Sequence, residues 1–281
     1  MELLDKDQNI YIFRKDSKNF FHFCPDRGGI ITNWTSDSEN ILYFDHDRFL
    51  DNNLSIRGGI PILFPICGQL DQKMPFFGKY YKQFNQHGFA RDIKWNCEFN
   101  RCKECVSLIL RETNLTKNFF PFKFILKIDV ILKLSSLNFE ITIENKSSEF
   151  MPISFGLHPY FNISEFRNIT FQNFPIICQN QKKNIIVKTE TCLEQIHNGV
   201  DLLMYTHGKI SFEDKGFSRK ITLIHPSPID IGVIWTNPPR KMLCMEPWTS
   251  PRNSLQEGIR KILVPPHDEI ELFASITKES I

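Results

Sequence analysis

The sequence lacks the features that mark membrane proteins and nucleic-acid-binding proteins. No stretch of the 281-residue chain has the roughly 18 consecutive apolar residues of a membrane-spanning helix. Residues 1–7 lack the apolar core of a secretory signal peptide. The 34 basic and 32 acidic residues leave a formal net charge of +2, which is too balanced to favour nucleic acid or an anionic membrane. We therefore expect a cytoplasmic protein with no nucleic-acid partner and no membrane partner.

Sequence signatures of nucleotide and metal chemistry are also missing. The chain has no Gly-x-Gly-x-x-Gly segment, no Walker loop and no His-Glu-x-x-His. Cys102 and Cys105 form a Cys-x-x-Cys pair with Cys97 upstream, but no second Cys or His pair follows at zinc-finger spacing. In a cytoplasmic protein the eight cysteines are expected to be reduced. We expect free thiols, no metal and no organic cofactor.

The chain does contain a long succession of short strand patterns. Apolar and polar residues alternate most strongly over residues 122–133 and 137–144, which predicts half-buried antiparallel strands. A long loop is expected over 69–84. Other strands are expected at residues 10–14, 20–23, 30–34, 41–44, 93–99, 105–110, 210–212, 220–225, 230–236 and 270–277. Because no linker divides them, the pattern predicts an all-β fold, one large antiparallel β-sandwich domain over residues 1–281.

One histidine lies in an apolar and aromatic stretch, Phe155-Gly-Leu-His-Pro-Tyr-Phe-Asn162. Residues 151–154 before it alternate like a strand, and Pro159 pushes His158 toward an extended conformation. We therefore expect His158 at a strand end with aromatic neighbours. A histidine there can titrate near neutral pH and transfer a proton, or it can be a core residue bonded to a backbone carbonyl. This stretch alone leaves both interpretations open.

Arginine, histidine and glutamate occur in three further distinctive segments. Arg57 precedes Gly-Gly-Ile-Pro, where glycine permits unusual backbone conformations and proline stiffens the chain. A guanidinium held there suits hydroxyls, carboxylates or phosphate, although it can also be a surface arginine beside a turn. His87 and Arg91 belong to a His-Gly-Phe-Ala-Arg segment. Glu246 ends an apolar run before Pro-Trp, and by itself it favours an exposed strand-end carboxylate.

Taken in order, these segments resemble the aldose 1-epimerase family of galactose mutarotase-like proteins. Arg57-Gly-Gly-Ile-Pro and His87-Gly-Phe-Ala-Arg are similar to the branch that includes the glucose-6-phosphate 1-epimerases, and His158-Pro-Tyr-Phe-Asn and Glu246-Pro-Trp complete the series. The tail Glu-Pro-Trp-Thr-Ser-Pro-Arg-Asn-Ser-Leu resembles a less characterised bacterial branch. The resemblance covers most of the chain. It implies a large twisted β-sandwich that interconverts the α and β anomers of an aldose.

For the chemistry, the resemblance implies that His158 is the general acid and Glu246 the general base. The base takes the proton of the hydroxyl on C1 while the acid protonates the ring oxygen. After rotation about the C1–C2 bond, ring closure reverses both transfers. A carboxylate and an imidazolium can do this without a metal or organic cofactor. The alternative is a non-catalytic carbohydrate-binding β-sandwich, although binding alone needs no acid–base pair.

For binding, the resemblance implies that Arg57 and His87 contact the sugar and that Asp201 holds its hydroxyls. The match at Asp201 is looser, because Asp-Leu-Leu-Met-Tyr stands where the family often has Asp-Arg-hydrophobic-Tyr. Arg57 and Arg91 are candidates for holding a phosphate group. Arg91 is followed by Asp92, so it could instead form a structural ion pair. The expected partner is a small-molecule sugar or sugar phosphate, and the sequence does not decide between them.

Overall fold

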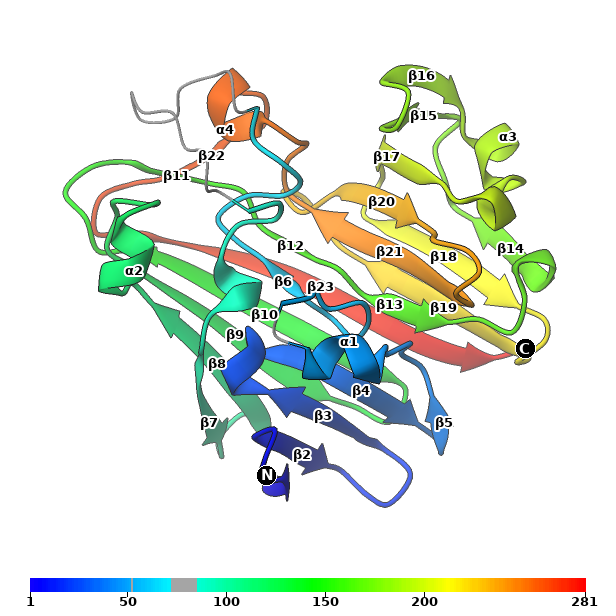
Figure 1. The fold of residues 1–281 in the computed structure, drawn as a ribbon, viewed down its shortest axis with the longest axis horizontal. Coiled ribbons are helices and arrows are strands. Elements are labelled where there is room, and N and C mark those ends of the chain that lie inside the picture. Colours follow the sequence, from blue (N-terminus) through cyan, green and yellow to red (C-terminus); the bar gives the residue numbers. More distant parts are fainter. Residues whose placement is uncertain (52, 72–84) are drawn as a thin grey trace.

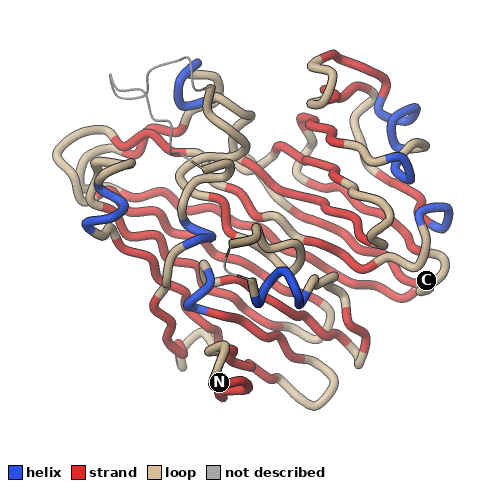
Figure 2. The backbone as a smooth tube through the Cα atoms, viewed as in Figure 1, coloured by secondary structure: helices blue, strands red, loops and turns tan. Residues whose placement is uncertain are grey.

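Strands are the main regular element of the computed structural model, and helices are short segments between them (Figure 2). The structure describes residues 1–51, 53–71 and 85–281, so most of the loop expected over 69–84 lies outside the described residues. All strand pairs within the sheets are antiparallel, as in β10 with its neighbours β9 and β23. The predicted all-β, antiparallel fold class is therefore confirmed.

The sheet formed by the N-terminal strands lies in front of part of a longer sheet in Figure 1. The N-terminal sheet has the order β1-β2-β3-β4-β5, and the long sheet has the order β14-β18-β19-β23-β10-β9-β8-β7. The N-terminal strands are β1 (Glu2–Asp5), β2 (Ile10–Arg14), β3 (Phe20–Cys24), β4 (Ile30–Ser36) and β5 (Glu39–Asn40). The long sheet comprises β7 (Asn96–Asn100), β8 (Cys105–Arg111), β9 (Phe124–Leu132), β10 (Ser136–Asn145), β14 (Ile169–Gln172), β18 (Lys209–Asp214), β19 (Arg219–Ile224) and β23 (Glu269–Ser280).

A third sheet, here called the site sheet, has the order β16-β15-β17-β20-β21-β12-β6, with β13 also paired to β21. Its strands are β6 (Ile62–Leu63), β12 (Gly156–Leu157), β13 (Tyr160–Asn162), β15 (Ile177–Asn180), β16 (Ile185–Lys188), β17 (Asp201–Tyr205), β20 (Ile231–Trp235) and β21 (Met242–Trp248). A separate pair joins β11 (Met151–Ile153) to β22 (Ile262–Val264). The strand β21 is buried along its whole length, so its side chains contact other parts of the protein and have little contact with bulk solvent.

The helices of the described residues are at most five residues long. The α-helices are α1 (His46–Leu50), α2 (Asn114–Lys117), α3 (Thr189–Leu193) and α4 (Ser254–Glu257), and the 3₁₀ turns are η1 (Pro25–Arg27), η2 (Ala90–Asp92), η3 (Phe166–Asn168) and η4 (Ile196–Asn198). Over the described ranges, the chain has no helix with the length and apolar character needed to cross a bilayer. The helices serve as connections around the sheets (Figure 1).

The register between paired strands brings the apolar residues of the alternating sequence together in the core. Phe139 on β10 lies opposite Val130 on β9, and Ile141 lies opposite Ile128. All four side chains are buried, because residues two apart on a strand face the same side of a sheet. The expected strand over 41–44 is wrong, since Leu42 and Phe44 make only isolated bridges, to Phe161 and Gly58.

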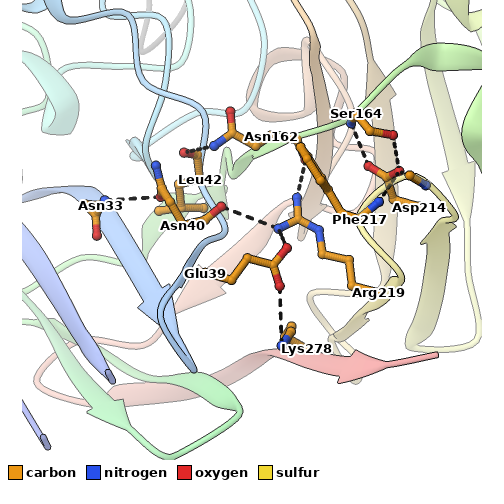
Figure 3. A network of polar contacts seen from close by, with 11 residues as sticks. Asn33, Glu39, Asn40, Leu42, Asn162, Ser164, Asp214, Phe217, Arg219 and Lys278 are labelled. Carbon is orange, nitrogen blue, oxygen red and sulfur yellow. Dashed lines mark hydrogen bonds and ion pairs between the residues drawn. The ribbon is translucent and has the colours of Figure 1, made fainter. Parts of the chain in front are cut away.

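A buried polar network connects the N-terminal sheet, the long sheet and the site sheet (Figure 3). Arg219 on β19 is fully buried, and its guanidinium donates to Glu39 Oε1 on β5 at 2.6 Å and to the backbone carbonyl of Asn162 on β13. The guanidinium carbon also lies 4.8 Å from the centroid of the Phe217 ring. Lys278 on β23 forms a second ion pair with Glu39, at 3.4 Å. One carboxylate therefore compensates two cations that have little access to water.

Candidate active site

Side chains from the site sheet and the neighbouring loops line a small cavity of about 170 Å³. All six candidate residues of the sequence analysis lie on it, although they come from segments far apart in the chain. The lining comprises Arg57, His87, Arg91, His158, Asp201 and Glu246 together with Ser55, Gln86, Val233, Trp235, Trp248 and Arg252. Most of these side chains are polar or charged, so the cavity suits a polar ligand.

Glu246 lies within the site sheet, on β21, where its Cα pairs with that of Val233 on β20. Its relative exposure is 1%, so the interpretation as an exposed strand-end carboxylate is wrong. The indole Nε1 of Trp248, two residues along the same strand face, donates to Glu246 Oε2 at 3.1 Å. Gly156 on β12 allows this packing, because a Cβ there would lie 2.7 Å from the Trp248 ring. The other oxygen, Oε1, faces His158.

His158 lies at the strand end between β12 and β13, as the sequence predicted. Its backbone N–H donates to the Pro61 carbonyl at 3.0 Å, and its ring stacks on Tyr160 with centroids 4.6 Å apart. Nε2 lies 3.4 Å from Glu246 Oε1, while Nδ1 makes no hydrogen bond to another described residue. The side chain is therefore oriented by aromatic stacking and directed toward a carboxyl group, unlike a core histidine bonded to a carbonyl.

Burial controls the protonation of this pair. Burial lowers the pKa of His158 well below its ordinary value, and the charges of Arg91 and Arg57 lower it further. Burial also raises the pKa of Glu246 well above its ordinary value, and the Asp201 carboxylate adds to the increase. With shifts in these directions, the two groups together hold one proton over a wide pH range and can exchange it across the 3.4 Å between them.

We expect any proton-transfer reaction at this site to have a bell-shaped pH dependence. As the pH falls through the lowered pKa of His158, the pair gains a second proton and can no longer accept one. As the pH rises through the raised pKa of Glu246, the pair loses its last proton and can no longer donate. The pH dependence of kcat/KM measures both limbs. An acid limb at or above the ordinary histidine pKa would contradict this expectation.

His87 is held in a fixed orientation by Gly68. The His87 N–H donates to the Gly68 carbonyl at 2.6 Å, and Nδ1 of the ring accepts from the Gly68 N–H at 3.1 Å. This leaves Nε2 as the N–H donor, because burial lowers the pKa of His87 well below its ordinary value and keeps the ring neutral. His87 has a φ of 69°, a backbone strain that is common at functional sites. The next residue, Gly88, has a positive φ of 76°, and a Cβ there would lie 2.2 Å from the Phe64 carbonyl oxygen. Both facts favour glycine at this position.

Arg57 and Arg91 bring two guanidinium groups to the cavity. The Arg57 guanidinium carbon lies 5.1 Å from the centroid of the Trp235 ring, which holds the group by a cation–π contact. Arg91, in η2, is mostly buried, and its Nε makes no hydrogen bond within the described residues. Asp92 Oδ1 lies 4.0 Å from that Nε, beyond hydrogen-bonding distance. The Arg91–Asp92 ion pair considered from the sequence is therefore a long contact.

Asp201 does lie on the cavity, despite its looser match to the family pattern. It begins β17, and its two oxygens accept from Arg252 Nη2 at 2.8 Å and from Gln181 Nε2 at 2.6 Å. Arg252 was not singled out from the sequence. The signal that could have found it is its position in the Glu246-Pro-Trp-Thr-Ser-Pro-Arg tail. Asp201 and Arg252 thus form a preset pair of acceptor and donor at the cavity wall.

Three donor atoms at this site have types that bind metal ions. A ring nitrogen of His158, Sγ of Cys244 and a carboxylate oxygen of Glu246 lie within 4.8 Å of one another, and all three residues are buried. Cys244 lies on the same face of β21 as Glu246, two residues away. All eight cysteines of the chain are free thiols. Apart from metal binding, the site offers one shared proton, several fixed hydrogen-bond donors and a small polar cavity.

Comparison with known proteins identifies relatives along most of the chain. Residues 15–277 match the family model described as "Aldose 1-epimerase". Among solved structures, the Slr1438 protein from Synechocystis sp. PCC 6803 is 33% identical with a TM-score of 0.91, over 97% of this chain and 96% of that one. The galactose mutarotase related enzyme from Lactobacillus acidophilus is 19% identical with a TM-score of 0.77, over 96% of this chain and 97% of that one. The second likeness concerns the fold alone.

Curated relatives are more distant in sequence. "Protein LacX, plasmid" from Lactococcus lactis subsp. lactis is 24% identical over 234 residues, which are 72% of this chain and 77% of that protein. "Putative glucose-6-phosphate 1-epimerase" from Cenchrus ciliaris is 29% identical over 154 residues, which are 50% of this chain and 44% of that protein. The chain therefore spans less than half the length of this last relative.

Proposed function

Because this chain belongs to the aldose 1-epimerase family, we propose that it interconverts the α and β anomers of a hexose by acid–base ring opening and closure. The observation that carries the proposal is the buried pair on the cavity wall, with His158 Nε2 3.4 Å from Glu246 Oε1. The opposite pKa shifts of the two groups supply the single mobile proton that the reaction needs.

In the proposed mechanism, the ion-pair form of the site opens the ring. Glu246 accepts the proton of the C1 hydroxyl while the His158 imidazolium donates a proton to the ring oxygen. The pair is then a neutral imidazole beside a neutral carboxylic acid, which is the form that burial favours. The low-dielectric site therefore favours the neutral protonation state that accompanies the open-chain aldehyde. Rotation about C1–C2 and reversal of both transfers give the other anomer.

The residues around the pair would hold the sugar during this exchange. His87 presents Nε2–H, and Asp201 with Arg252 presents an acceptor beside a donor, so hydroxyls of both orientations find partners. A non-catalytic sugar-binding protein would need these groups but not a buried carboxyl of raised pKa beside an imidazole. Anomer exchange measured by NMR magnetisation transfer on a panel of hexoses and hexose 6-phosphates separates the two functions. Binding of a sugar without any enhanced exchange would favour the binding module.

We further propose that the preferred hexose carries a phosphate group. Arg57 and Arg91 are both on the cavity, and Arg91 Nε lies 4.0 Å from Asp92 Oδ1 without a hydrogen bond to it. Phosphate takes bidentate, charge-assisted hydrogen bonds from guanidinium groups, which are stronger than those of neutral hydroxyls. Two cations beside a small polar cavity therefore favour an anionic substrate, such as a hexose 6-phosphate.

Replacing Arg91 tests the phosphate directly. Arg91→Ala should lower kcat/KM for glucose 6-phosphate on the order of 10–100-fold, because a hydrogen-bonded charge partner is lost, and change kcat/KM for glucose much less. Arg101→Ala, at an exposed arginine outside the cavity, is the matched control and should change neither. The preference would be refuted if the wild type had equal kcat/KM for the free and phosphorylated sugars and if Arg91→Ala changed both values to the same extent.

A further inference from the structure

We propose that His158, Cys244 and Glu246 form a binding site for a borderline or soft divalent cation, Zn²⁺ or Cd²⁺, and that the bound ion blocks anomer exchange. The three donor atoms lie within 4.8 Å of one another in a buried setting. The metal site follows from this geometry alone. Only its inhibitory effect rests on the proposed function, because the ion would occupy the acid–base pair.

The strands bring the three donors together. Cys244 and Glu246 are two residues apart on β21, so both side chains face the same side of the sheet. Tyr160 on β13 pairs with Cys244 and also stacks under the His158 ring, which places the imidazole over the same face. Ligands of a tetrahedral zinc ion lie roughly 3.5 Å apart, given bond lengths of about 2.0–2.3 Å. Shifts of about 1 Å therefore suffice to close the site around an ion.

The cavity supplies the access and the fourth ligand. His158 and Glu246 line the cavity, whereas Cys244 is fully buried and is not among the lining residues. An ion entering from the cavity would meet the imidazole and carboxylate first and then the sulfur. Its fourth position would remain open to water, as in zinc sites with three protein ligands. A sugar and the ion would need the same two residues, so they should compete.

Charge and ligand type decide which ions fit. When the Cys244 thiol and the Glu246 carboxyl release their protons to solvent, their two negative charges balance a divalent cation. Arg57 then faces a neutral centre, and Arg252 is already paired with Asp201. A sulfur and an imidazole nitrogen favour Zn²⁺ and the softer Cd²⁺ over Mg²⁺ and Ca²⁺, which prefer all-oxygen ligands.

Titration of the full chain with Cd²⁺ tests the site with two independent readouts. Wild type should bind one ion with thiolate-to-metal charge-transfer absorption and lose anomer exchange, whereas Mg²⁺ should do neither. Cys244→Ala and Cys244→Ser, each compared with its own metal-free rate, should lose the absorption and need at least about tenfold more Cd²⁺ for the same fractional inhibition. Cys67→Ala, at another buried thiol, and Cys102→Ser, at the exposed thiol, are matched controls and should behave as wild type.

Absorption that persists in the Cys244 variants, or that is lost in Cys67→Ala or Cys102→Ser, would overturn the site. So would a Cd²⁺ inhibition that is equally strong with and without Cys244. Using both the alanine and the serine variant keeps the test valid if one of them folds poorly. Cys244-dependent absorption in a protein that never accelerates anomer exchange would support the metal site and refute the proposed function, so the two failures can be distinguished.

Discussion

His158→Asn and Glu246→Gln should each lower the rate constant for anomer exchange by about 10²–10⁴-fold, the usual contribution of one positioned acid or base. Asparagine can hydrogen-bond but cannot carry the proton between C1 oxygen and ring oxygen. Glutamine likewise preserves the shape of Glu246 and the contact with Trp248 but removes the group that titrates. NMR magnetisation transfer between the α and β anomers at saturating sugar gives the rate.

The double variant is the sharper measurement. Because the two groups share one proton, their effects should be far from additive, and the double variant should be little slower than the slower single variant. His207→Asn and Glu257→Gln, at exposed residues outside the cavity, are matched controls that should leave the rate unchanged. Near-wild-type exchange in either single variant would mean that His158 and Glu246 are not the acid and base.

Glu39→Ala should destabilise the fold by about 3–5 kcal/mol, the cost of leaving a buried cation without its partner. Glu39 pairs with Arg219, whose side chain is 0% exposed, and with Lys278, whose side chain is 9% exposed. Its removal leaves these two cations without the carboxylate between them. Urea denaturation followed by circular dichroism gives the free energy of unfolding, and the melting temperature should fall on the order of 10 °C.

A second variant shows whether charge is the cause. In an Arg219→Met background, Glu39→Ala should cost much less, because the most buried cation is then absent. Glu271→Ala, an exposed carboxylate on β23, is the matched control and should change the free energy of unfolding by no more than about 0.5 kcal/mol. A cost of Glu39→Ala that is the same in both backgrounds would assign the effect to lost packing.

What the sequence predicted well depends on local pattern. The alternation over residues 122–133 and 137–144 is a property of neighbouring residues, and it appears as β9 and β10, in which buried and partly exposed residues alternate over much of the length. The proline after His158 likewise acts locally, and it gave the strand end correctly. The set of cavity residues came instead from the order of the distinctive segments and their family resemblance.

What the sequence did not predict depends on contacts between distant segments. Residues 41–44 have a strand-like composition, yet they pair only by single bridges, because the fold gives them no continuous neighbour. Arg252 reaches Asp201 across 51 residues, and Arg219 reaches Glu39 across 180. The local periodicity of the sequence does not predict such long-range pairs. The sequence also gave no sign of a metal-binding role for Cys244, because a cysteine in an apolar run has the pattern of an ordinary core residue.

The wide spread of the cavity residues along the chain also bears on how the protein folds. Arg57, His87, His158 and Glu246 meet only after the loops between them have closed, and closing long loops is slow because the chain loses much entropy before any contact forms. A chain that has formed only its hairpins can already show the circular dichroism of strands without having the acid–base pair. During refolding, recovery of the proposed anomer exchange should therefore lag behind recovery of secondary structure, because that exchange requires the complete tertiary structure.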